Sequence, residues 1–244
     1  MASVAIGVLV SINGVDLSCV LQSLNMSAKA DVLQNTTLCA TSAHTHQKAL
    51  TERSLSGAGF FKSSTVTAEN AHGLFNTALD SVAGNYLLLY GRDGATDGAL
   101  AELMNLVETK YDINTVVGEF VGVTFDAQTT KTDSANNYQI GVFLFNQTVT
   151  GATNGATYDS TSGGTGYLIQ IHNLAGDGTA AVIIQHSTNG STWADLVATA
   201  NYAVASGTQV ANTATSVNRY LRAVVTPNGT TNRVAIGIKV GYTG

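Results

Sequence analysis

Residues 234–240 read VAIGIKV, in which large apolar residues alternate with small or polar ones. Because successive side chains of a β-strand point to opposite faces, this period predicts a strand with one buried face. Further apolar runs, each bounded by turn-forming residues, predict strands at 140–145, 167–171, 180–184 and 221–225. The single proline, Pro227, interrupts none of these predicted strands.

The pair Asn189-Gly190 lies between two apolar runs and predicts a β-hairpin. Trp193 follows the turn, and we expect it to be buried in the core of a sandwich. The stretch 187–193, STNGSTW, also superficially resembles the turn-and-tryptophan motif of sialidase Asp boxes and of some sugar-binding sandwiches. An Asn stands where that motif has Asp and the spacing is one residue short, so carbohydrate binding stays open as an alternative.

One segment, residues 67–82, has its apolar residues at helical spacing along one face. Thr67 suits the N-cap, Glu69 suits the first turn, and Gly84 follows as a stop. We therefore predict one amphipathic helix, which must pack on a sheet. A second, weaker helical turn is predicted over residues 98–108, where Leu100 and Met104 align with two further apolar residues.

Residues 32–56 form a long polar stretch with little periodicity, and we predict a loop there. Loops of this length are usually functional or disordered. A polar arm held between two strands is suited to reaching a neighbouring subunit. Its candidate assembly residues are Asn35, Thr36, Thr37, His44, His46, Lys48, Glu52 and Arg53.

The chain is unusually poor in charge. Charged residues make up 11% of its 244 residues, against roughly 25% in an average protein. A soluble monomer usually carries more charge, so this composition fits a surface that is buried against copies of itself, although a secreted β-protein rich in Thr, Ser and Asn has a similar composition. The net charge of −5 and the absence of a basic patch argue against tight nucleic-acid binding.

The composition also changes near residue 132, where we place a domain boundary. Residues 1–132 hold 7 Lys/Arg and 12 Asp/Glu, a net charge of −5, whereas residues 133–244 hold 4 of each and are neutral. Residues 126–137 contain no large apolar side chain. The expected units are 1–132 and 133–244.

The cysteines and the N-terminus suggest no special chemistry. Cys19 and Cys39 are expected to be buried free thiols, because no CxxC pair signals zinc or a disulfide framework. The apolar run 4–10 is too short to cross a bilayer and lacks the basic start of a signal peptide, so it is predicted to be the first strand. No contact with a membrane is expected.

The sequence contains no grouped catalytic set. His44-x-His46 could bind a metal only with distant help, from His72 or Asp31 for example, and a polar loop is the better interpretation. Residues 93–98, DGATDG, look like a calcium loop but lack its alternating ligands. Neither a phosphate loop nor a nucleophile elbow occurs. Paired carboxylates remain open because they meet only in space, yet we expect no enzyme and no cofactor.

Several motifs follow one another in a fixed order along the chain. Early in the chain stand INGVDLS (12–18), DVLQNTT (31–37) and LSGAGFF (55–61), followed by the predicted helix and VGEFVGVTF (117–125). The second half adds TGYLIQIH (165–172), IQHS (184–187) leading to WADL (193–196), and VNRYLR (217–222). This order of motifs resembles the major tail tube proteins of long-tailed bacteriophages, although Cys39 and the His-rich stretch depart from the family pattern.

This resemblance implies a mainly β fold: a tail-tube-like β-sandwich or barrel with one flanking α-helix, plus a C-terminal β-sandwich segment or extension. It implies six-membered rings that stack into a hollow tube for genome passage, built in the host cytoplasm and carried in the virion. The implied partners are further copies, the tape measure, terminator and baseplate or tip proteins, and DNA in transit. The alternative is a capsid or tail-surface sandwich that binds host glycans.

Overall fold

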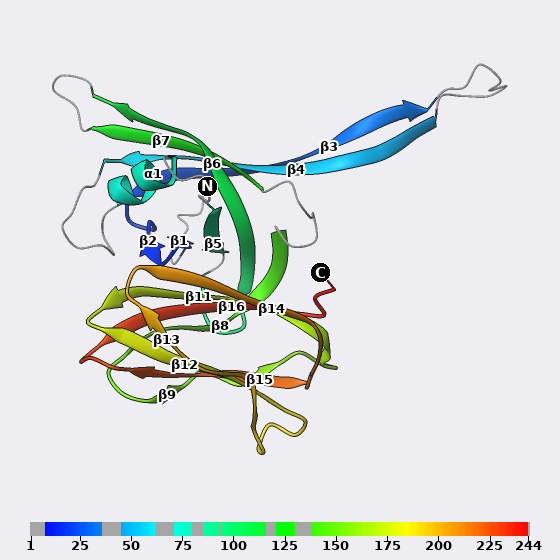
Figure 1. Cartoon of the computed structure of the whole chain (residues 1–244), viewed down its shortest axis with the longest axis vertical. Coiled ribbons are helices and arrows are strands. Elements are labelled where there is room, and N and C mark those ends of the chain that lie inside the picture. Colours follow the sequence, from blue (N-terminus) through cyan, green and yellow to red (C-terminus); the bar gives the residue numbers. More distant parts are fainter. Residues whose placement is uncertain are drawn as a thin grey trace, which may run out of the picture.

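The computed structural model describes residues 8–35, 45–61, 71–79, 85–92, 94–115, 121–129 and 138–243. These residues form a mainly β molecule with one short helix (Figure 1). The first half contains β1 (Leu9–Ile12), β2 (Val15–Asp16), β3 (Leu21–Asn35), β4 (Thr45–Phe60), α1 (Ala71–Leu79), β5 (Asn85–Gly91), β6 (Leu100–Asn114) and β7 (Gly122–Thr129).

The second half is described without a gap from Tyr138 to Thr243. Its strands are β8 (Tyr138–Val149), β9 (Thr153–Asn154), β10 (Tyr158–Asp159), β11 (Gly164–Gly176), β12 (Thr179–Ser187), β13 (Ala194–Ala203), β14 (Ser206–Val217), β15 (Tyr220–Pro227) and β16 (Asn232–Val240). The predicted strands at 140–145, 167–171, 180–184, 221–225 and 234–240 are confirmed, as β8, β11, β12, β15 and β16.

One large sheet of 11 strands runs through both halves, in the order β14-β11-β16-β8-β6-β5-β1-β2. β7 pairs with the second part of β6, and β4 and β3 continue the sheet beyond β7. The link between the halves is β8, which pairs with β6 through residues 138–142 and with β16 through residues 142–149. The large sheet therefore continues past the composition change, whose residues 130–137 lie outside the described chain.

A smaller sheet of five strands, β10-β15-β12-β13 with β9 on β15, covers one face of the large sheet in the second half. The core between them is made of alternate side chains such as Ile169, Ile236 and Val225. The opposite face of β11 and β16 packs against the first half, through Leu168 and Ala235 among others. β16 is thus buried on both faces, and the prediction of a half-buried strand is wrong: its small residues Ala235 and Gly237 mark a second tight interface.

Several polar contacts join the halves at this second interface. His172 of β11 is fully buried; its Nδ1 accepts from the Gly14 amide (3.3 Å), and the Ser11 hydroxyl lies 2.7 Å away. Arg233 of β16 forms an ion pair with Asp16. Gly14 has a φ of +81°, and a Cβ there would lie 2.4 Å from the backbone of Ser206, so the turn between β1 and β2 requires glycine.

The predicted helix is confirmed over Ala71–Leu79, and the flanks of the predicted range 67–82 lie outside the described residues. The second predicted helical turn, 98–108, is wrong because Leu100 to Glu108 belong to β6. β6 is a central strand between β5 and β8, so Leu103 and Met104 are buried on opposite faces. Pairing on both edges outweighs the helical spacing of this segment.

The loop predicted over residues 32–56 is also wrong where the chain is described. β3 extends to Asn35 and β4 starts at Thr45, and the two pair from Leu21↔Gly59 to Asn35↔Thr45. Residues 36–44 lie outside the described chain. We call the β3–β4 hairpin the arm. Figure 1 shows it projecting from the body as a two-stranded ribbon, and 15 residues of strand span about 50 Å.

Three smaller predictions have mixed outcomes. Asn189-Gly190 does join a hairpin, because β12 and β13 pair on either side of it. Trp193 is not in the sandwich core; it is half-buried and lies against the Arg222 guanidinium. Cys19 is a free thiol but is exposed rather than buried, and Cys39 lies outside the described residues. The first strand starts at Leu9, and residues 1–7 are likewise outside the described chain.

Candidate assembly surface

One face of the arm carries polar side chains, whereas apolar side chains of the opposite face, at the base, pack against the body. Ser27 and Ser54 face each other across the ribbon with their hydroxyl oxygens 2.6 Å apart. Lys29 stands opposite Glu52 in the register, and both are exposed. Cross-strand pairs of this kind hold a ribbon together weakly, so the arm depends on its base for orientation.

One edge of the arm is unpaired. Among the described residues β3 bonds only to β4, whereas β4 also bonds to β7. An open strand edge is a row of backbone donors and acceptors that can extend a sheet into another chain. Natural monomers blunt such edges with prolines, bulges or charges. β3 contains no proline, and its charged residues are Lys29 and Asp31, with bulges near Ser23 and Asp31.

The predicted assembly residues are distributed along this ribbon. Asn35, His46 and Lys48 lie in paired positions near the far end, and Thr36, Thr37 and His44 are outside the described residues. Glu52 is exposed on the shaft, whereas Arg53 is half-buried at the base. The strands therefore place Asn35, His46 and Lys48 together, about 20 Å from Glu52 and Arg53.

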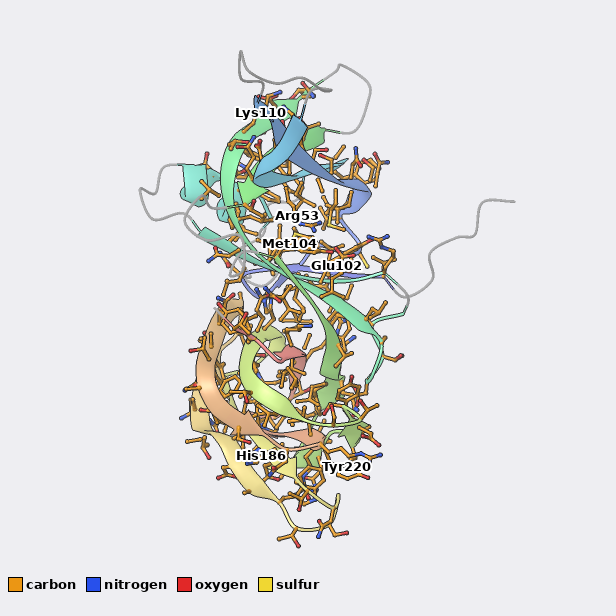
Figure 2. The ribbon with its side chains drawn as sticks, turned by 90° about the vertical axis from the view of Figure 1, so that its right-hand side faces the viewer. Arg53, Glu102, Met104, Lys110, His186 and Tyr220 are labelled. Atoms are coloured by element: carbon orange, nitrogen blue, oxygen red, sulfur yellow. The ribbon has the colours of Figure 1, made fainter. Side chains whose placement is uncertain are left out.

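The base of the arm borders a cavity of about 130 Å³, lined by residues of β3, β4, β6 and β8 and by Arg92, which follows β5. Arg53 lies with its guanidinium carbon 3.6 Å from the ring centroid of Tyr138. On the same lining, Arg92 donates to the Glu102 carboxylate at 2.8 Å. Figure 2 shows Arg53, Glu102 and Met104 close together at this point. The face of the tyrosine ring attracts the charge of Arg53.

Exposed apolar side chains mark a second part of the surface. Leu100 is 58% exposed and Ile140 is 50% exposed. They flank a shallow depression of about 290 Å³ that also contains Tyr158 and Lys239. Clustered apolar side chains at a surface usually mark contact with another molecule.

Two groups with strongly shifted pKa values, Glu108 and His172, lie in the core and not in either depression. Burial raises the pKa of Glu108 to about 7, and the Tyr86 hydroxyl that donates to it opposes this rise. Burial lowers the pKa of His172 to about 3. Neither residue faces a substrate-sized cavity, so both are structural groups.

The described residues form neither a cluster that could bind a metal ion nor a helix that could span a membrane. The described residues contain no group of three or more His, Cys, Asp or Glu side chains that could hold a metal ion. His72, suggested as a distant ligand, instead lies 3.0 Å from the Tyr111 hydroxyl; the side chains of His46 and Asp31 are outside the described set. No helix in the described part of the chain is long and apolar enough to cross a membrane.

Sequence reasoning missed Tyr138, Arg92 and Glu102 at the base of the arm. Tyr138 is in β8, Glu102 is in β6 and Arg92 follows β5, and these segments meet only in the folded sheet. Their one local signal is the aromatic start of the run at Tyr138, which follows a segment without large apolar residues.

Comparison with known proteins gives remote structural likenesses. No protein-family model and no curated protein matches the sequence. Among solved structures, a chain from the virion of a native gene transfer agent particle is 14% identical, with a TM-score of 0.39, over 57% of this chain and 98% of that one. A chain from the tail of an empty gene transfer agent particle, refined with C6 symmetry, is 14% identical, with a TM-score of 0.38, over 54% and 96%.

The SPP1 Dit protein, described as a paradigm of the hub adsorption apparatus in phages that infect Gram-positive bacteria, is similar over more of the chain. It is 9% identical, with a TM-score of 0.37, and the match covers 95% of this chain and 99% of that one. At these identities and TM-scores, we base the functional argument on the chain's own residues.

Proposed function

We propose that this chain is a structural virion protein that assembles with copies of itself into stacked rings, which form the hollow tail tube of a long-tailed bacteriophage. The arm is the observation that carries the proposal. It is a long ribbon with an open edge. Its base contributes Leu55 to the chain's own core, and the ribbon projects beyond that contact (Figure 1). Ordering such a segment costs conformational entropy, and contacts with a second copy offset that cost.

Two further features support assembly. Charged residues are only 11% of the sequence, which reduces repulsion between copies of the chain. The exposed Leu100 and Ile140 lie on the body, where Ile140 pairs with Glu102 beside the base of the arm. Each copy thus carries an extending ribbon and an apolar patch near its base, two surfaces through which copies would meet.

The remaining assignments follow the family resemblance. Rings of six copies would stack through the arm, with residues 1–132 building the ring and residues 133–244 forming a sandwich on it. The excess of carboxylates in residues 1–132 would keep passing DNA from sticking to the tube wall. The tape measure, terminator and baseplate or tip proteins are the proposed partners. The protein would assemble in the host cytoplasm and act in the virion, without catalysis, cofactor or membrane.

Negative-stain electron microscopy of the purified protein tests this function. We expect hollow filaments or rings from the native chain. In the test variant, Asn-Gly replaces residues 31–50, joining the paired residues Ala30 and Thr51 in a tight hairpin turn. This shortened arm should leave a folded chain, with an unchanged circular dichroism spectrum, that forms no filaments.

The matched control shortens a different hairpin. Replacing residues 188–192 with Asn-Gly changes the turn between β12 and β13 and should leave filaments intact. Normal tubes from the shortened arm would overturn the role of the arm. A native chain that stays monomeric at every concentration would overturn the tail tube function itself.

A further inference from the structure

The outer face of the smaller sheet carries a connected line of polar and aromatic side chains. Ile184 of β12 and Leu221 and Ala223 of β15 point inward and are fully buried. Because side chains alternate along a strand, their neighbours point outward. These neighbours are Gln185, Tyr220 and Arg222, and Asp195 lies opposite Gln185 where β13 pairs with β12. We call these four residues, with Trp193 from the adjoining turn and Arg219 just before β15, the outer row: Gln185, Trp193, Asp195, Arg219, Tyr220 and Arg222.

Hydrogen bonds fix the centre of the outer row across three strands. Gln185 donates from Nε2 to the Asp195 carboxylate at 2.9 Å, and its Oε1 accepts from Arg222 Nε at 2.9 Å. The Arg222 guanidinium lies 4.2 Å from the Trp193 ring centroid. This contact holds the indole ring on the outer side of the sheet, where sequence reasoning had expected a core residue.

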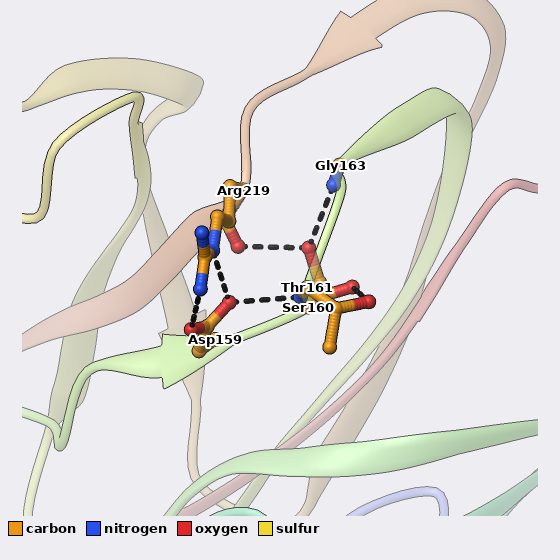
Figure 3. A network of polar contacts seen from close by, with 5 residues as sticks. All are labelled: Asp159, Ser160, Thr161, Gly163 and Arg219. Atoms are coloured by element: carbon orange, nitrogen blue, oxygen red, sulfur yellow. Dashed lines mark hydrogen bonds and ion pairs between the residues drawn. The ribbon is translucent and has the colours of Figure 1, made fainter.

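An ion pair extends the row at its other end (Figure 3). Arg219 donates twice to Asp159, at 2.7 Å for both bonds, and its guanidinium lies 5.0 Å from the Tyr220 ring centroid. Hydrogen bonds from Arg219 lower the pKa of Asp159, which keeps the pair charged.

The chemistry of the outer row selects one class of ligand. Arg219 is paired with Asp159, and Arg222 and Asp195 both bond to Gln185, so two arginines and two aspartates give the surface donors and acceptors with a formal net charge of zero. A charged polymer would gain little electrostatic attraction from this surface. A neutral sugar can pair its hydroxyl groups with amide, carboxylate and guanidinium groups while its C–H face packs on an aromatic ring. Side chains already held by mutual hydrogen bonds lose little entropy on binding.

We propose that the outer row binds neutral hexopyranose units of a polysaccharide, with Trp193 as the stacking platform and Gln185, Asp195 and Arg222 as the polar contacts. This function is additional to tube assembly, because the outer row lies on the small sheet and not on the arm.

A glycan microarray carrying neutral and anionic bacterial polysaccharides, probed with the full-length chain, tests the proposal. We expect binding to at least one neutral polysaccharide. The sequence contains a single tryptophan, so the emission of Trp193 should shift when that polysaccharide is titrated into the native chain. Trp193→Leu should weaken binding about tenfold, the loss of one stacking contact, whereas Trp193→Phe should retain most of it.

Two variants keep the test decisive. Asp195→Asn retains the size of the side chain and should also weaken binding even if Trp193→Leu folds poorly. Thr226→Ala, on the same strand and face but outside the row, should bind like the native chain. The proposal is overturned if no neutral polysaccharide binds, if only anionic ones bind, or if neither Trp193→Leu nor Asp195→Asn reduces binding.

Discussion

Glu108 is a buried carboxyl group in the middle of β6, and its ionisation should make the stability of the folded state depend on pH. One carboxylate oxygen accepts from the Tyr86 hydroxyl, and the other is buried without a partner among the described residues. Desolvation disfavours the charged form. The neutral acid is therefore the form that the fold prefers.

We predict that Glu108 makes the folded state less stable as the pH rises. Its pKa is raised from 4.5 to about 7. Its contribution to the stability of the folded state is therefore complete below pH 4.5 and is lost as the pH rises through 7. The slope is at most about 1.4 kcal/mol per pH unit for one proton. Urea unfolding of the native chain and of Glu108→Gln at several pH values in this window measures it. Equal slopes in both proteins would contradict the prediction.

His172 should have the opposite effect on how the stability of the folded state depends on pH. Burial lowers its pKa from 6.5 to about 3, so only the unfolded chain takes up the proton in this range. Stability should be lost as the pH falls from 6.5 towards 3. We expect the imidazole signals of His172 in NMR spectra, assigned with a His172→Asn variant, to stay at their neutral positions down to about pH 4. A titration midpoint near 6.5 would show that the site is open to water.

Helix α1 is held to the sheet by aromatic packing. It has nine residues, with no acidic residue in its first turn and no basic residue in its last, and isolated helices this short are unstable in water. Phe75 stacks on Phe125, with ring centroids 4.5 Å apart, and on Tyr111 at 5.4 Å. The edge of Tyr86 completes the contact.

Phe75→Ala should therefore lower the free energy of unfolding by about 3–5 kcal/mol, the usual cost of removing a buried phenyl ring. The amides of α1 should also exchange with deuterium faster than those of β6. Urea unfolding and hydrogen exchange measure the two effects. Asn76→Ala, on the exposed side of the same helix, is the control and should change stability by less than about 0.5 kcal/mol. A similar loss from both variants would show that packing does not hold the helix.

The arm shows how an element can be misjudged from local sequence. Its polar residues lack the apolar alternation that identifies a half-buried strand. Strand formation there depends on pairing between residues as far apart as Asn35 and Thr45, and on β7 beside the base. Glu52 and Arg53 could be selected from sequence as polar residues, but the Arg53–Tyr138 contact could not.

At the scale of the whole molecule, the continuous large sheet makes the two halves dependent on each other. β8 is bonded to both, and the contact of His172 with the turn at Gly14 joins them again. Separating the halves would expose Leu168, Ala235 and the apolar side chains around them to water. Burial of that surface should couple unfolding of the first half to unfolding of the second.

We therefore predict one cooperative transition in differential scanning calorimetry. The variant with the shortened arm is suited to this experiment because it should not assemble. The calorimetric and van 't Hoff enthalpies should agree, as they do for two-state unfolding. Two separate transitions, or a stable fragment of residues 133–244 after limited proteolysis, would instead show that the predicted boundary near residue 132 divides independent domains.

The sequence by itself determined the features that depend on near neighbours along the chain. The alternation in VAIGIKV, the Asn189-Gly190 turn and the helical stripe around Phe75 each reflect side chains a few residues apart, so strand, hairpin and helix could be predicted. The tertiary structure alone decided which strands pair, that β16 is buried on both faces, that 98–108 is a strand and that Trp193 lies outside the core. Those outcomes depend on contacts between residues far apart in the chain, and such contacts override local preference because burial and pairing contribute more free energy than propensity does.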